Sequence, residues 1–248
     1  MDIIKKLLEH VGGMTILFLQ AVKFIFVNPP KIRHILKQIA EIGADAAPLI
    51  IITGFFTGGV LVVETYPTFH KFNAEFLIGA LVSLSLSREV APVLVALLVT
   101  ARSGSAMAAN IGTMRITEQI DALEVLAVNP VRYLITPRLI AAIIVVPLLT
   151  LLSIFSGILG GYFVGVHLYS INPYLFVEKM KDLTELYDIL GGLYKAVAFG
   201  IVITIVSTYF GYIAKGGAEG VGKATTTAVV VSSVLILILD YFLTSLIY

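Results

Sequence analysis

The sequence predicts an all-α integral membrane protein: five transmembrane helices, an N-terminal interfacial amphipathic helix and a further short helix on the cytoplasmic side. Composition is the first observation, because 58% of the 248 residues are hydrophobic and only 13% are charged. A soluble domain is nearer ~45–50% apolar. The second is a series of long apolar stretches, each close to the ~20 residues with which a helix crosses the hydrocarbon core.

Five stretches are long enough to span. They cover residues 46–66, 75–101, 139–166, 190–213 and 226–247. The earlier stretch 11–27 is shorter, contains Gln20 and Lys23, and ends at the sequence "NPPK". This pattern favours a helix that lies in the membrane interface, although a sixth span remains an alternative. We therefore divide the chain into an N-terminal segment, residues 1–40, and a membrane domain, residues 41–248.

The distribution of Lys and Arg predicts the orientation. The connections on the side of the N-terminus carry most of these residues, whereas those on the other side carry Lys71, Lys179 and Lys181. Because positive charge is enriched in cytoplasmic loops, we expect a cytoplasmic N-terminus. Five spans then place the C-terminus on the opposite side.

Several chemistries have no support in the sequence. Cysteine is absent, the four histidines share no metal-ligand spacing, and a net charge of +1 gives no reason to expect nucleic acid. The stretch "GGAEGVGKAT", residues 216–225, approaches a phosphate-binding loop, but Ala224 stands where a Ser or Thr must hold Mg²⁺. We read it as a short turn between two spans.

The connection between the second and third spans contains a predicted amphipathic helix at residues 115–128. Ile116, Ile120, Leu123 and Ala127 form one stripe at helical spacing, and Asn129-Pro130 would end the helix. The other side carries acidic residues, Glu118, Asp121 and Glu124. A solvated face and a face that enters a groove of a partner protein are equally consistent with this pattern.

Four charged residues fall within the predicted spans: Arg88, Glu89, Lys195 and Asp240. A single charge at membrane depth costs roughly 3 kcal/mol, so these residues should face a cavity or one another. One interpretation is a lipid-binding site in which Arg88 and Lys195 contact an anionic headgroup. The alternative is an ion network that only fixes the register of the helices.

Small residues recur at spacings of three to four in two predicted spans, at Gly54 and Gly58 and at Gly157 and Gly161. Such spacing lets helix backbones approach closely. The contact could lie within one chain or between two copies.

Residues 87–141, from "SREVAPVLVALLVTARSG" to "GTMRITEQIDALEVLAVNPVRYLITPRLIA", closely resemble the signature region of the MlaE/YrbE permeases. The resemblance extends more weakly over residues 40–248. Two positions depart from the family pattern: Asn110 replaces a usual Glu, and Ala91 replaces a usual Gly.

The resemblance implies a homodimeric, non-catalytic permease in a bacterial inner membrane. It would belong to an ATP-driven phospholipid transporter that maintains the lipid asymmetry of the outer membrane. A cytoplasmic ABC ATPase, which binds the ATP and Mg, would dock on the coupling helix 115–128, with Glu118, Asp121, Leu123 and Glu124 as contacts. A periplasmic MCE-domain protein would sit on the other face, and the four intramembrane charges would line the lipid cavity. This chain itself would hold no cofactor and no metal.

Two other classes remain open. A proton-coupled secondary transporter could use Glu89 and Asp240 as proton carriers. A structural scaffold would bind partners without lipid. An intramembrane enzyme has less support, since no Ser or His in the spans stands beside a matching base.

Overall fold

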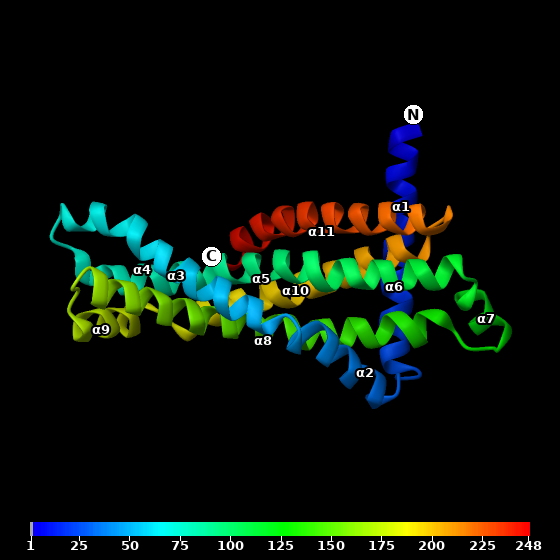
Figure 1. The fold of residues 1–248 in the computed structure, drawn as a ribbon, viewed down its shortest axis with the longest axis horizontal. Helices are drawn as coiled ribbons and strands as arrows, with labels where there is room; N and C mark the ends of the chain where they lie inside the picture. Colours follow the sequence, from blue (N-terminus) through cyan, green and yellow to red (C-terminus); the bar gives the residue numbers. More distant parts are fainter. Residues whose placement is uncertain (1) are drawn as a thin grey trace.

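Long helices lie side by side along most of the length of the structure (Figure 1). The computed structural model describes residues 2–248, which form helices and connecting turns without a β-strand, so the predicted all-α class is confirmed. Met1 lies outside the described residues. The α-helices are α1 (Asp2–Phe26), α2 (Ile32–Ile39), α3 (Ala47–His70), α4 (Ile78–Ser85), α5 (Ala91–Val99), α6 (Ser105–Ile116), α7 (Gln119–Val125), α8 (Thr136–Phe163), α9 (Pro173–Leu183), α10 (Leu186–Tyr212) and α11 (Gly217–Ile247).

Shorter helical turns join or extend several of these helices. They are one 3₁₀ turn, Glu75–Leu77, and five π-helical turns, Ala40–Ala44, Leu86–Val90, Thr100–Gly104, Val131–Ile135 and Val164–Leu168. By length and composition, six helical stretches could cross a membrane: Leu8–Phe26, Ile32–His70, Glu75–Ile116, Val131–His167, Leu186–Tyr212 and Gly217–Ile247. The last five correspond to the five predicted spans.

The second span continues well beyond its predicted end at residue 101. Helices α4, α5 and α6 follow one another without a break and reach Ile116, so the connection to the third span shortens to residues 117–130. Packing explains the extension, since small residues let α6 contact α10: a Cβ added at Gly211 would lie only 2.7 Å from the Ala108 carbonyl oxygen. Arg102 does not interrupt the helix, because its guanidinium reaches Asp45 at 3.4 Å.

Helix α1 runs across the other long helices rather than along them, at the end of the bundle that carries α7 (Figure 1). Its buried residues, Leu17 and Ala21, pack in one cluster with Leu139 of α8 and Ile205 of α10. Much of its remaining surface is exposed. Because α1 is also long and apolar enough to span, its position in the membrane interface stays a prediction.

Helices α3 and α8 touch through their backbones. A Cβ added at Gly58 would lie 1.8 Å from the Gly157 carbonyl oxygen, and one added at Gly160 would lie 1.9 Å from the Phe55 carbonyl oxygen. The glycines Gly54 and Gly161 face the same seam. The small residues noted in the sequence therefore serve packing within one chain.

The prediction of one continuous helix at residues 115–128 was wrong. Glu118 adopts a left-handed backbone conformation (φ 59°) that separates α6 from α7. At the other end, Ala127 is left-handed as well (φ 57°), and Val128 N–H donates to the Leu123 carbonyl while Ala127 N–H donates to Glu124. These two bonds form a Schellman motif, which ends the helix before Asn129. Asn129 instead accepts hydrogen bonds from the N–H groups of Val131 and Arg132 and begins the next helix.

Residues 216–225, the stretch that approaches a phosphate-binding loop, are mostly helical. The turn between the two spans is therefore shorter than predicted. The turn ends at Gly216 and Gly217, whose φ values of 92° and 69° suit glycine. Residues 218–225 already belong to α11. Gly220 N–H already donates to the Gly216 carbonyl, so this stretch forms a helix rather than a loop around phosphates.

The close contact between α3 and α8 leads to a testable prediction about stability. Gly58→Ala should destabilise the chain by about 1–3 kcal/mol, because the methyl group meets the Gly157 backbone and the helices must separate. Gly222→Ala is the matched control: no atom lies within 4 Å of an added Cβ, and alanine favours the helix. Thermal unfolding in mild detergent measures both. Equal unfolding midpoints for the two variants would contradict the proposed packing.

Candidate functional site

Lys195 of α10 is the centre of a charge cluster inside the bundle. None of its side-chain surface is exposed. Its ammonium donates to Glu89 Oε2 at 2.6 Å, to Thr244 Oγ1 at 2.6 Å and to the Arg88 carbonyl oxygen at 3.1 Å. These three bonds use all three N–H donors, so Asp240, 3.1 Å away, contacts the charge without a hydrogen bond. A lysine held in this way is fully compensated despite its burial.

Three backbone features bring Lys195 to this position. Pro92 has no N–H, so the Arg88 carbonyl, four residues earlier, loses its usual α-helical donor and is open to the lysine. Arg88 and Glu89 lie in the π-helical turn Leu86–Val90, a type of turn common at functional sites. Gly192 then lets α10 approach this turn, since a Cβ there would lie 2.0 Å from the Ser87 carbonyl oxygen.

Arg88 points away from Lys195 and pairs with Asp188, near the start of α10. Its Nε donates to Asp188 Oδ1 at 2.7 Å, and a second guanidinium nitrogen lies at the same distance from that oxygen. The Tyr248 ring lies 4.6 Å from the guanidinium carbon, and its hydroxyl donates to the Asp188 carbonyl at 3.1 Å. Asp188 also accepts from the Glu185 N–H in the capping box of α10. One carboxylate therefore begins the helix and orients the arginine.

The cluster combines the four residues singled out in the sequence with three that sequence reasoning missed. Asp188, Thr244 and Tyr248 complete it. Thr244 had a usable signal, since it lies four residues after Asp240 on the same helical face. Asp188 lay outside the predicted span 190–213. The four residues singled out in the sequence carry two positive and two negative charges. With Asp188 the cluster has two cations and three carboxylates, so its net charge is negative.

Exposure differs sharply within the cluster. The Arg88 side chain is 41% exposed, whereas Lys195 has no exposed surface. Arg88 is therefore the cation that an approaching ligand can contact in this conformation. Among residues 2–248 no group of three or more His, Asp or Glu side chains is placed to hold a metal ion.

The four residues predicted to contact a partner lie on or beside α7, at the opposite end of the bundle from α9 (Figure 1). Glu118 is exposed, and Leu123 is half-buried against the core. Asp121 pairs with Arg115 at 2.5 Å, and Glu124 accepts a long hydrogen bond of 3.4 Å from the Tyr212 hydroxyl. Two apolar side chains at the tip, Val125 and Leu126, are 86% and 71% exposed.

These observations define the class first: the chain is a multi-pass α-helical membrane protein with a compensated charge cluster between its spans. The family follows from comparison with known proteins. The model of the family "Permease MlaE" matches residues 35–246, and the chain belongs to this family.

Individual relatives cover nearly the whole chain. A probable ABC transporter permease protein of Rickettsia typhi is 42% identical over 243 residues, which is 98% of this chain and 94% of the relative. The intermembrane phospholipid transport system permease protein MlaE of Haemophilus influenzae is 39% identical over 90% of this chain and 87% of its own length. The chloroplastic protein TRIGALACTOSYLDIACYLGLYCEROL 1 of Arabidopsis thaliana is 35% identical over 86% of this chain and 61% of its own length. The chain is therefore an ABC transporter permease of the MlaE family.

Removal of the central cation should destabilise the fold. Lys195→Met leaves Glu89 and Asp240 without their shared partner, which should cost about 3–5 kcal/mol. Lys179→Met removes a cation from a surface pair with Asp182 and should change stability little. Denaturant unfolding in mild detergent compares the two. If Lys195→Met unfolds at the wild-type midpoint, the cluster does not hold these helices together.

Proposed function

We propose that this chain is the membrane subunit of an ATP-driven transporter that moves phospholipid to or from the outer membrane and so maintains its lipid asymmetry. A partner ATPase hydrolyses the ATP, and this chain forms the path of the lipid. Family membership supports the transport class, and the phospholipid named for the Haemophilus relative supports the substrate.

The charge cluster is the observation that carries the proposal. Arg88, Glu89, Lys195 and Asp240 would form the polar wall of the lipid cavity. Arg88 is partly exposed and can form charge-assisted hydrogen bonds with a phosphate group. Lys195 stays buried and holds Glu89 and Asp240 in place. The lipid headgroup would thus contact one cation, Arg88, and the buried ion network around Lys195 would support this contact.

At the other end, we propose that the ATPase binds α7. The exposed tip residues Val125 and Leu126 offer an apolar contact, and Glu118 and Glu124 add charge at its edge. Two further residues would hold this surface in place: Asp121 through its ion pair with Arg115, and Leu123 through its packing against the core. An apolar centre with a charged rim is the usual composition of a protein interface.

The orientation belongs to the same proposal. The end with α7 would be cytoplasmic and the end with α9 and the C-terminus periplasmic, in a bacterial inner membrane, as the Lys and Arg distribution favours. An MCE-domain protein would cover the periplasmic end, and two copies of this chain would form the cavity. ATP and Mg would be held by the partner ATPase.

Purification from the native membrane tests the function. The chain, tagged and gently solubilised, should copurify with an ABC ATPase, an MCE-type protein and phospholipid. Glu118→Lys and Glu124→Lys should each lower ATPase recovery about tenfold, which corresponds to about 1.4 kcal/mol of binding. The control is Glu219→Lys, which changes an exposed acidic residue of α11 and should leave ATPase recovery unchanged.

Mass spectrometry of the purified material identifies the partners. Recovery of the chain alone, even after crosslinking, would contradict the ATP-driven transporter. A proton-coupled carrier that uses Glu89 and Asp240 would then be the better interpretation, and transport driven by a proton gradient without ATP would support it.

The lipid site makes a separate prediction. In Arg88→Gln, a photoreactive anionic phospholipid should label peptides of α10 and α11 about tenfold less than in the wild type, because a charge-assisted hydrogen bond is lost. Lys71→Gln removes an exposed cation beyond the end of α3 and should leave labelling unchanged. Wild-type labelling in both Arg88→Gln and Lys195→Ala would contradict the assignment of this cluster to the lipid.

A further inference from the structure

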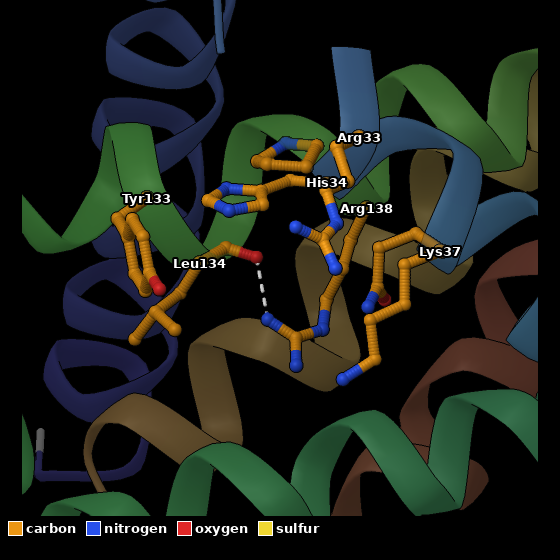
Figure 2. Close-up of a pocket in the computed structure, with 8 residues that line it drawn as sticks. Arg33, His34, Lys37, Tyr133, Leu134 and Arg138 are labelled. Atoms are coloured by element: carbon orange, nitrogen blue, oxygen red, sulfur yellow. Dashed lines mark hydrogen bonds between the residues drawn. The ribbon is translucent and has the colours of Figure 1, made fainter. Parts of the chain in front are cut away.

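A second polar cavity lies far from the Lys195 cluster, between α2 and the start of α8 (Figure 2). Its volume is about 550 Å³. Three cationic side chains line it: Arg33 and Lys37 from α2, and Arg138 from α8. Figure 2 shows their nitrogen atoms turned toward one shared space. No carboxylate lines this cavity.

Arg138 is the anchor of the cavity because it is nearly buried and incompletely paired. Only 8% of its surface is exposed. Within the part of the chain that the structure describes, its guanidinium makes one hydrogen bond, from NH1 to the Leu134 carbonyl at 2.5 Å, and no ion pair within 4.0 Å. A buried cation is stable only with a counter-charge or further hydrogen-bond acceptors. The remaining N–H groups are therefore available to an anion in the cavity.

The nearest candidate counter-ion is already engaged elsewhere. Glu41 accepts a hydrogen bond from Gln38 Nε2 at 2.8 Å, and its other oxygen lies 3.6 Å from Lys37 Nζ. It is not within ion-pair distance of Arg138. Glu41 therefore offsets part of the charge of Lys37, and the three cations that line the cavity keep an excess of positive charge.

The spacing of the two cations on α2 leads to the same conclusion. Arg33 and Lys37 are four residues apart, so both lie on one helical face, where like charges repel and destabilise a helix. An anion bound between them would remove this repulsion. A smaller adjoining cavity of about 210 Å³ shares His34 and Tyr133 with the first and adds Lys31 and Arg132. The positive surface therefore continues around the base of α2.

We propose that this cavity binds the phosphate of an anionic lipid headgroup, in a site distinct from the Lys195 cluster. Guanidinium groups match phosphate oxygens in geometry and charge. Helix α2 also exposes Ile32 (74%) and Leu36 (59%), which offer acyl chains an apolar surface beside the cations. A free phosphate would use the cations alone. Basic pockets between membrane helices are a known way of holding anionic lipids.

The test is thermal unfolding of the full-length chain in mild detergent and Hepes buffer, with three additives in turn: phosphatidylglycerol, phosphatidylcholine and inorganic phosphate. We expect phosphatidylglycerol to raise the unfolding midpoint of the wild type most. The concentration needed for this effect should rise about tenfold or more in Arg138→Gln and in the double variant Arg33→Gln/Lys37→Gln. Because the residues of the double variant are exposed, it should still fold if Arg138→Gln does not.

The control is Lys215→Gln/Lys223→Gln, which removes two exposed cations outside both cavities and should respond like the wild type. Arg88 is intact in every variant, so a loss reports on this cavity and not on the proposed transport site. Equal protection by inorganic phosphate would overturn the assignment to a lipid. Equal protection by phosphatidylcholine, or the same loss in the control, would overturn the anion site itself.

Discussion

The ammonium group of Lys195, without exposed surface in an apolar bundle, is the constraint to which the neighbouring helices conform. Its charge requires acceptors and counter-charges on every side, and these come from different helices: Glu89 and the Arg88 carbonyl from the π-helical turn, and Asp240 and Thr244 from α11. In lipid, the hydrophobic effect does not drive helices together, so such contacts can set their register. Pro92 and Gly192 provide the open carbonyl and the close approach that this contact needs.

The other side of the bundle is held together by a different means. Helices α3 and α8 meet through glycines, so their association depends on backbone contact and tolerates no added methyl group. The α10–α11 side depends on charge and hydrogen bonds instead. Packing of small residues gives a rigid contact, whereas an ion cluster can exchange partners without a change of volume. The polar side is thus better suited to binding and release.

Hydropathy predicted the positions of the spans because a helix in lipid must be apolar over a fixed length. The cost of charge at membrane depth singled out Arg88, Glu89, Lys195 and Asp240 for the same reason. Asp188 was missed because it caps α10 at the edge of the apolar stretch, where charge is inexpensive. The break at Glu118 was missed as well, since nothing in a stripe of apolar residues indicates a left-handed residue, and no local pattern revealed the π-helical turns.

The two charged sites differ in what an incoming phosphate must displace. At the Lys195 cluster, carboxylates outnumber cations and Arg88 is already paired with Asp188, so a headgroup must compete with that carboxylate. Competition of this kind weakens binding and favours release, as a transport path requires. At the cavity beside α2, Arg138 has no carboxylate partner within the described residues, so an anion can bind to this guanidinium without displacing one. If both sites bind lipid as proposed, the first arrangement suits a lipid in passage, and the second suits a lipid that remains bound.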